Sequence, residues 1–339
     1  MAEQTDEALW FKLDQLVWSC VISQAVHVAV QLDVPELLEH GPKSAEQLAA
    51  ATSSDVATLE SMLFALTAFE VLAMDEREYF SLTEMGTFLL KSKPGIPQEA
   101  GLFFETIYKP LGALLHAVRT GERAFDHVFH TTFFEYLAQN PAVGHFFNEQ
   151  MIRNGPGRYG ALSSVYDFSN VKKVVDVGGG QGGLLLHLLA QRPHLTGILF
   201  DLPSVVAGAR QRFEQAGLSG RCEIVGGTFL KSVPRGGDLY IVASVMNNLR
   251  DADASRLLAN CRAVMEREAR LLILDNPRKF GDQPKKWGSL VTLGIAAQRG
   301  AFRSRTEMRF RELLRAEGFE LASMRPGLPQ HALIEAVPI

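Results

Sequence analysis

The sequence contains few of the residues that build metal sites and disulfide frameworks. Its three cysteines, Cys20, Cys222 and Cys261, lie too far apart in the chain for the spacing of a zinc site or a redox pair. We therefore predict no metal site, and we expect three reduced thiols in a cytoplasmic protein.

The sequence also lacks an excess of positive charge and a long apolar run. Its net charge of −4 argues against nucleic acid as a partner, because proteins that bind nucleic acid generally carry a basic surface. Polar residues or glycine interrupt the apolar stretches before they reach the about 18 residues that span a membrane, so we predict no membrane partner. No basic cluster precedes the first apolar residues, so we expect no secretory signal.

The N-terminal part has the pattern of a helical domain. Apolar residues recur at helical spacing over residues 8–40, on a face wide enough to pack against another subunit. Residues 43–95 are typical of a winged helix, with Ser44 as the cap of one helix, a second helix over 55–69 and a wing strand over 79–83. The second helix carries acids and no base where a DNA-reading helix needs cations, so we predict a scaffold or dimerisation element rather than a transcription factor.

Residues 101–168 are helical in pattern and rich in aromatic residues. We expect some of these aromatics to line an apolar substrate pocket at the domain junction, with Phe104 and Tyr108 as candidates. His127 and His130 also lie here, but no acid spacing supports a metal site. The segment 155–157 (Gly-Pro-Gly) predicts a helix break, which places the domains at 1–155 and 156–339.

After residue 165, strand and helix patterns alternate, which predicts a Rossmann-like, doubly wound α/β sheet. The last two strand segments lie close together with prolines and glycine between them, which indicates a hairpin and an antiparallel edge strand. We expect strands over residues 173–177, 197–201, 222–225, 238–243, 270–275, 319–324 and 331–337.

A glycine turn follows the first of these strands. The glycines Gly178, Gly180 and Gly183, with Asp201 at the end of the next strand, fit a dinucleotide fingerprint. Asp176 favours S-adenosylmethionine (SAM) instead, because a carboxylate can face the cationic amino acid end of SAM but would repel a pyrophosphate. A dinucleotide site and a glycine turn without a ligand remain the alternatives.

The chain resembles the SAM-dependent small-molecule O-methyltransferases of the plant caffeate type and of bacterial polyketide and antibiotic pathways. The resemblance implies a helical, dimerising N-terminal domain, a homodimer and a C-terminal SAM-binding domain. It extends over nearly the whole chain and is carried by segments 117–121, 133–137, 147–151, 176–182, 201–203, 226–229 and 303–307.

The resemblance also assigns roles to individual residues. Gly178, Gly179 and Gly180 would pass the methionine end of SAM. Asp201 would hold the ribose, and Thr228 and Phe229 would lie at the adenine. Met151 would touch the acceptor, and we add Met246, which precedes Asn247, as a further candidate. The cofactor set implied in this way is Asp176, Gly178, Gly179, Gly180, Asp201, Leu202, Thr228, Phe229, Ala243 and Ser244.

The catalytic segment departs from the family pattern. Asn247 occupies the position of the usual histidine base, and an amide cannot accept a proton at neutral pH. The carboxylate that often orients the histidine falls at Ser304. We therefore expect Asn247 and Asn248 to align the acceptor, although the two asparagines could instead cap the helix after them. His331, His127 and His130 are weaker candidates for a replacement base.

Together these features predict methyl transfer to a small, aromatic or polyketide-like acceptor by proximity and orientation. O-methylation is favoured over transfer to carbon or nitrogen. The alternative is a SAM-binding relative that catalyses cyclisation or hydroxylation without methyl transfer, which the missing base motivates.

Overall fold

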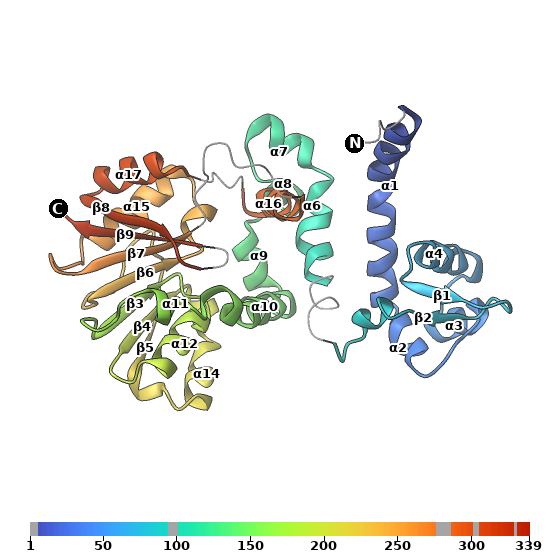
Figure 1. Cartoon of the computed structure of the whole chain (residues 1–339), viewed down its shortest axis with the longest axis horizontal. Coiled ribbons are helices and arrows are strands. Elements are labelled where there is room, and N and C mark those ends of the chain that lie inside the picture. The colour runs from blue at the N-terminus through green and yellow to red at the C-terminus, as the bar shows by residue number, and fades with distance from the viewer. Residues whose placement is uncertain (1–5, 94–100, 276–285, 301–304, 329–330) are drawn as a thin grey trace. The chain divides into compact units, whose positions relative to one another are not determined.

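The computed structural model describes residues 6–93, 101–275, 286–300, 305–328 and 331–339, without the side chains of residues 154, 156 and 286–288. The chain divides into two compact units, Met1–Glu105 and Thr106–Ile339, which are described separately below (Figure 1).

The N-terminal unit contains the predicted pair of helices with a wing. Ser44 caps α3 in a capping box with Gln47, as predicted, and Asp55 caps α4 by accepting a hydrogen bond from the Thr58 amide at 2.9 Å. Strands β1 and β2 pair in antiparallel fashion. The elements are α1 (Asp6–Gln31), α2 (Val34–Glu39), α3 (Ala45–Thr52), α4 (Val56–Ala68), β1 (Leu72–Met74), β2 (Phe80–Leu82) and the 3₁₀ turn η1 (Gly86–Leu89).

Helix α1 leaves most of its apolar side chains uncovered by its own unit. Trp10 and Trp18 are 66% and 64% exposed, and the buried residues of α1 are confined to its last turns. Length and composition alone would allow this helix to cross a membrane, a weak criterion that packed helices of soluble proteins also meet. An apolar face of this size is typical of a contact with another subunit.

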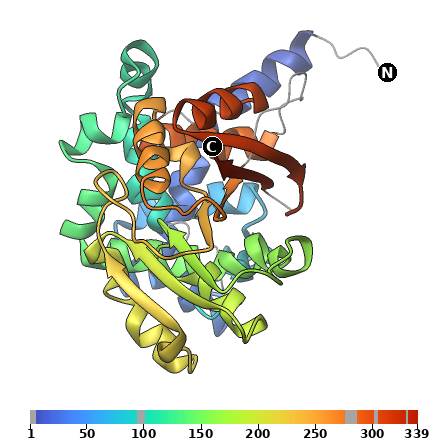
Figure 2. The same cartoon turned by 90° about the vertical axis from the view of Figure 1, so that its left-hand side faces the viewer.

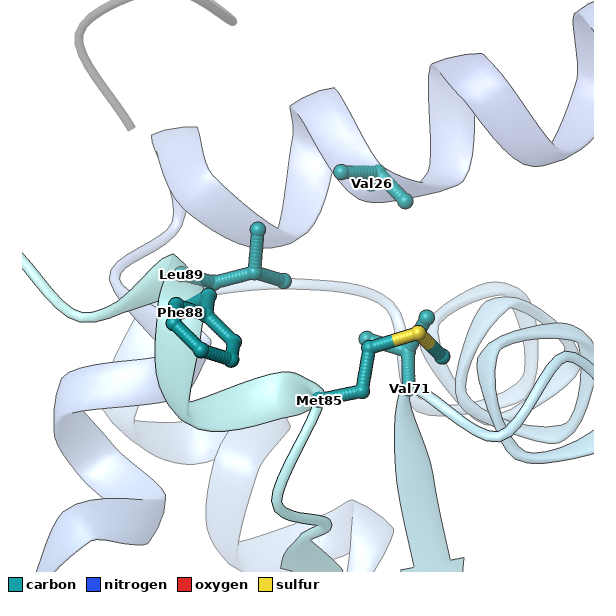
Figure 3. Close-up of a pocket in the computed structure, with 5 residues that line it drawn as sticks. All are labelled: Val26, Val71, Met85, Phe88 and Leu89. Carbon is teal, nitrogen blue, oxygen red and sulfur yellow. The ribbon is translucent and has the colours of Figure 1, made fainter. Parts of the chain in front are cut away.

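An apolar hollow lies between α1 and η1 in this unit. Figure 3 shows its lining side chains, which are Val26, Val71, Met85, Phe88 and Leu89. None of these side chains can transfer a proton or bind a charge. This hollow therefore offers packing surface and no chemistry.

The C-terminal unit begins with helices that the sequence had assigned to the first domain. The predicted boundary at residue 155 differs from the division in the structure, because helix α10 packs on α12 (Gly183–Gln191) within the C-terminal unit. These helices are α6 (Lys109–Leu111), α7 (Leu114–Thr120), α8 (Ala124–Phe129), α9 (Phe133–Gln139), α10 (Pro141–Tyr159) and α11 (Leu162–Val165), after a π-helical turn, η2 (Phe104–Tyr108).

The predicted helix break at residues 155–157 is wrong. Helix α10 continues through this segment to Tyr159. A Cβ atom on Gly183 would lie 3.7 Å from the Ile152 backbone, and one on Gly155 4.0 Å from the Gly183 backbone, which are ordinary van der Waals distances. Helix α10 thus packs against the start of α12 through this segment, and the glycines do not end the helix.

The C-terminal unit is built around a seven-stranded sheet in the order β5-β4-β3-β6-β7-β9-β8. All seven predicted strands are present, and β9 runs antiparallel to both β7 and β8, which confirms the hairpin at the sheet edge. The strands are β3 (Lys173–Val177), β4 (Thr196–Asp201), β5 (Cys222–Gly226), β6 (Leu239–Ala243), β7 (Arg270–Asp275), β8 (Phe319–Pro326) and β9 (Ala332–Pro338).

Helices cover both faces of this sheet (Figure 2). Helices α15 (Asp251–Arg262) and α17 (Glu307–Ala316) bury their apolar residues on one face, in a cluster that includes Val175 and Val177. Helix α12 and α14 (Ala209–Gln215) cover the other face, in a cluster with Val174. Alternate residues of β3 thus enter opposite core layers, as expected for a buried strand.

The topology brings the predicted cofactor residues to one edge of the sheet. The chain proceeds from β3 to β4 and β5 on one side, and then returns to place β6 and β7 on the other. The connections diverge at the carboxyl ends of β3 and β6, which is where open α/β sheets bind ligands. The residues that follow β3, β4 and β6 therefore share this edge.

Candidate active site

The glycine turn after β3 is packed tightly between its neighbouring strands. Gly178 donates its amide to the Phe200 carbonyl of β4 at 2.8 Å, and its φ of +74° is a conformation that side chains disfavour. A Cβ atom on Gly178 would lie 2.7 Å from a methyl of Val245. The turn therefore exposes backbone rather than side chains to a ligand.

Asp201 connects this turn to the end of β4. Its carboxylate accepts hydrogen bonds from the Gly180 amide at 2.7 Å and from the Leu202 amide at 2.6 Å. Burial raises the pKa of Asp201, and the two amides act in the opposite direction. The same carboxylate lies where an adenosine ribose could donate its hydroxyl groups.

Asp176 is the most unusual group of the site. Its side chain is 1% exposed, and neither carboxylate oxygen has a hydrogen-bond partner among the described residues. Burial, and secondarily the charge of Asp201, raise its pKa to about 7. Two acidic groups under one glycine turn fit a cationic ligand such as SAM and would repel a pyrophosphate.

The segment after β5 supplies the apolar surface predicted for the adenine. The Phe229 ring lies beside the turn, because a Cβ atom on Gly178 would be 3.7 Å from its Cε1 atom. Asn260 fixes this segment by donating to the Phe229 carbonyl at 2.7 Å. The Thr228 hydroxyl accepts a long hydrogen bond, 3.4 Å, from the Leu230 amide and keeps a proton to donate.

The end of β6 carries a hydrogen-bond chain of three side chains. Ser244, which follows Ala243, has a φ of +56°, and its hydroxyl lies 2.9 Å from the Tyr159 hydroxyl and 2.7 Å from His331 Nε2. Burial, together with the charge of Arg158, lowers the pKa of His331 to about 4. His331 is therefore a neutral imidazole at neutral pH, and it orients Ser244. The sequence had suggested His331 only weakly and had missed Tyr159.

The next residues form a 3₁₀ turn, η4 (Met246–Asn248), with both predicted catalytic asparagines. The Asn248 amide nitrogen donates to the Ser244 carbonyl at 2.7 Å, whereas the buried Asn247 Oδ1 has no partner among the described residues. The suggestion that an asparagine caps the following helix is wrong, because the cap position of α15 is Arg250. Asn247 thus offers an amide oxygen that no donor of the described residues satisfies.

Two family models match this chain. An O-methyltransferase dimerisation domain matches residues 15–92, and an O-methyltransferase domain matches residues 111–320. The second match alone covers more than half of the sequence. The chain belongs to the O-methyltransferase family.

Individual relatives agree with the family match. Phenazine O-methyltransferase PhzM of Lysobacter antibioticus is 33% identical, over 96% of this chain and 95% of that protein. O-demethylpuromycin-O-methyltransferase of Streptomyces alboniger is 34% identical, over 96% and 88%. A crystal structure of an O-methyltransferase from neocarzinostatin biosynthesis, in complex with SAM and 2-hydroxy-5-methyl naphthoic acid, has a TM-score of 0.84 and 26% identity, over 94% of this chain and 96% of that one.

These matches settle the class of the enzyme. It is a soluble, SAM-dependent methyltransferase of small molecules and forms a homodimer through its N-terminal dimerisation domain. That domain includes most of α1, whose apolar face is uncovered within its own unit. The alternatives of a dinucleotide enzyme and of a DNA-binding winged helix are not supported.

The turn η4 of this O-methyltransferase is held by a buried arginine. Arg305 donates to the Met246 carbonyl at 2.5 Å, to the Leu249 carbonyl at 2.8 Å and to Asp251 at 3.0 Å. It thereby fixes both ends of the segment that carries Asn247. Arg305 was not identified from the sequence. The only signal for it was its place in segment 303–307, which carries the family resemblance, because its contacts join residues far apart in the sequence. Ser304 lies outside the described residues.

We expect Arg305→Met to lower the free energy of unfolding by about 2 kcal/mol, because it leaves two buried carbonyls unsatisfied and removes one partner of a mostly buried ion pair. Urea unfolding of the apo-enzyme measures this change. The control is Arg309→Met, since Arg309 also pairs with Asp251 but is 44% exposed, and its loss should cost clearly less than the loss of Arg305. Equal effects of the two changes would contradict this role of Arg305.

The predicted acceptor residues have different surroundings in the structure. Met246 is fully buried in the core against the sheet, so its side chain serves packing rather than an open pocket. Phe104 belongs to the N-terminal unit, where its ring stacks on His27 at 4.0 Å between centroids. Met151 lies on α10 and Tyr108 on η2, in the C-terminal unit, and their roles stay predictions.

The other two candidate histidines make no hydrogen bond to the turn among the described residues. His127 and His130 are exposed, and the His127 ring stacks on His116. No cluster of metal-binding side chains occurs among the described residues.

Proposed function

We propose that this enzyme methylates a hydroxyl group of a small aromatic acceptor without a protein base. The observation that carries the proposal is Asn247, an amide in the middle of η4 whose buried oxygen accepts no hydrogen bond from the described residues. The neighbouring imidazole of His331 has a pKa of about 4, which is far too low to take a proton from an ordinary phenol. The acceptor must therefore arrive ionised or ionise readily.

The cofactor site follows from the groups at the sheet edge. When bound, SAM supplies an electrophilic methyl group on a positively charged sulfur. Asp176 lies under the turn as the anionic partner for its cationic end, and the glycine turn leaves room for its main chain. Asp201, with Leu202 after it, would hold the ribose, and Phe229 would contact the adenine. Thr228, Ala243 and Ser244 complete this proposed site.

The acceptor site is assigned to the segments beside β6. Asn247 and Asn248 would orient the acceptor, and Met151 would contact its apolar part. Asn248 is itself fixed through the Ser244 carbonyl, and the Ser244 hydroxyl is fixed by Tyr159 and His331. These groups hold a reacting oxygen in place and exclude water, so that proximity and orientation provide the rate. The acceptor proton leaves to solvent before transfer.

A series of phenols that differ in acidity, incubated with methyl-labelled SAM, tests this proposal. We expect the label in an ether product, with one S-adenosylhomocysteine (SAH) per product, and a rate that rises with pH up to the pKa of each phenol. Asn247→His should reduce this dependence on the acceptor, since a general base contributes roughly 10²–10⁴-fold. Product without label would reject methyl transfer. A pH profile that is the same for all phenols would reject the absence of a base.

We also propose a cytoplasmic location. Cys20, Cys222 and Cys261 form no disulfide in the structure, which is consistent with a reducing compartment.

A further inference from the structure

Arg299, in the last turn of α16 (Lys286–Arg299), lies on a floor of aromatic rings. Its guanidinium carbon is 4.9 Å from the centroid of the Phe133 ring and 5.0 Å from that of Phe147. Its Nε atom donates to Gln298 at 2.8 Å, and Gln298 donates to Thr106 at 2.6 Å. This guanidinium is therefore held in place, but it forms no ion pair with the described carboxylates.

A second arginine reaches the same face of α10. Phe147 and Met151 are four residues apart and Arg158 follows seven residues later, so the three share one side of the helix. The Arg158 side chain extends back along this side until its Nη1 lies 4.0 Å from Met151 Sδ. Arg299 covers Phe147, which lies about one helical turn (about 5 Å) from Met151 along α10. Arg158 also forms no ion pair with a described carboxylate.

Two cations in this position are unfavourable without an anion. Both arginines are partly buried. Burial, and secondarily the charge of Arg158, lower the pKa of Arg299 to about 10. Unpaired buried charge is costly, and a pair of like charges adds repulsion. The planar guanidinium is also the side chain best suited to a carboxylate, which it binds through two parallel hydrogen bonds.

We propose that Arg299 and Arg158 bind a carboxylate, and that this carboxylate belongs to the acceptor. This inference rests on the proposed function and narrows its substrate to a hydroxyaryl carboxylic acid. The buried rings of Phe133 and Phe147 support the guanidinium of Arg299 from below. Met151, assigned to the acceptor by resemblance, lies beside Arg158 and one helical turn from Phe147.

SAM also has a carboxylate, so the source of the anion needs a structural argument. Arg299 belongs to α16 and packs over side chains of α9 and α10, and these helices lie together in the C-terminal unit (Figure 1). The proposed cofactor residues instead follow strands β3 to β6. The contacts of Arg299 therefore favour the acceptor, and the experiment below separates the two sources.

The test measures binding of acids and of their uncharged amides to the full-length enzyme saturated with SAH. The probes are 2-hydroxy-5-methylnaphthoic acid and 2-hydroxybenzoic acid, each paired with its carboxamide. We expect the wild-type enzyme to bind at least one acid at least tenfold more tightly than its amide. Arg299→Met and Arg158→Met should each remove most of this preference, and Arg299→Lys should retain part of it.

Controls separate this role from folding and from cofactor binding. Arg256→Met removes the same charge from an exposed position on α15 and should leave the preference unchanged. Arg299→Met should bind SAH within about threefold of the wild type, which also reports that the variant is folded. A variant that loses SAH affinity but keeps the preference for acids would assign the carboxylate to the cofactor and reject the proposal.

Two further outcomes would overturn the carboxylate site. These are no preference for either acid in the wild type, and a preference that survives in Arg299→Met. Whether the enzyme transfers a methyl group is a separate result, which neither of these binding outcomes decides. Acids that bind through the arginines but receive no label from SAM would reject the proposed function and leave the carboxylate site in place.

Discussion

Gly179→Ala should weaken SAH binding by about 100-fold and destabilise the apo-enzyme by about 1–3 kcal/mol. A Cβ atom at this position would lie 2.5 Å from the Asp176 carboxylate and 2.6 Å from a methyl of Leu199. Both neighbours are fully buried and cannot move aside, with exposures of 1% and 0%. The turn itself must therefore shift, and a shift of about 1 Å removes its fit to the cofactor. Calorimetric titration with SAH and urea unfolding measure the two effects.

The matched control is Gly220→Ala, which makes the same chemical change where a Cβ atom meets nothing within 4 Å. It should bind SAH like the wild type. If Gly179→Ala also kept its SAH affinity within about threefold while losing stability, the turn would be a structural element only. The cofactor would then have to bind elsewhere.

Local patterns predicted much of the fold because each depends on residues close in sequence. The alternation of apolar strands with helices located all seven strands of the large sheet, and the short, proline-containing link before β9 indicated its antiparallel direction. Ser44 indicated the start of α3 as its N-cap, and in the structure it also forms a capping box with Gln47. These signals were reliable because one turn or one strand determines each of them.

The same local reasoning failed where packing decides. Gly155 and its neighbours have the composition of a helix break, but α10 continues through them and packs on α12. For the same reason the compact units divide at Glu105 rather than at residue 155. Local propensity does not show which partner a helix packs on, and here that contact outweighs it.

The site shows a similar division. Asp176, the glycines and Asp201 are close in sequence or follow successive strands, so their meeting at one edge could be predicted. Tyr159, Ser244 and His331 form one hydrogen-bond chain although 85 and 87 residues separate its links. Arg158 of α10 and Arg299 of α16, also far apart in sequence, both contact side chains of α10. No spacing rule predicts such contacts, and only the resemblance to the family identified Asn247.

The second large effect is expected for Asp176→Asn. This variant should be more stable than the wild-type apo-enzyme, and its advantage should grow as the pH rises. The usual pKa of this carboxyl group, 3.8, applies in the unfolded chain, and burial raises the pKa to about 7 in the fold. Between these values the folded state holds one proton more than the unfolded state, so wild-type stability falls as the pH increases. The full penalty of about 4 kcal/mol is reached above about pH 7. The amide variant does not carry this penalty.

Urea unfolding of both apo-enzymes at pH 5.5 and pH 8 measures this difference. The advantage of Asp176→Asn should be larger at pH 8 by about 2 kcal/mol, because the wild type carries only part of its penalty at the lower pH. Glu223→Gln is the control, since Glu223 is an exposed acid on strand β5 of the same sheet and its replacement should show no such pH dependence. An advantage that is independent of pH would mean that Asp176 is not an ionised, buried group.

The stabilised variant should bind the cofactor poorly, which explains why the sequence keeps an unfavourable carboxylate. We expect SAM to bind Asp176→Asn about 10–100-fold more weakly at pH 8, because a buried charge that lacks a protein partner is available to a cationic ligand. In the wild type, binding at pH 6 should release a proton, which calorimetry in buffers of different ionisation enthalpy detects. Unchanged affinity in the variant would remove Asp176 from the cofactor site. A stability gain combined with a loss of affinity would show instead that the fold tolerates this charge for the benefit of binding.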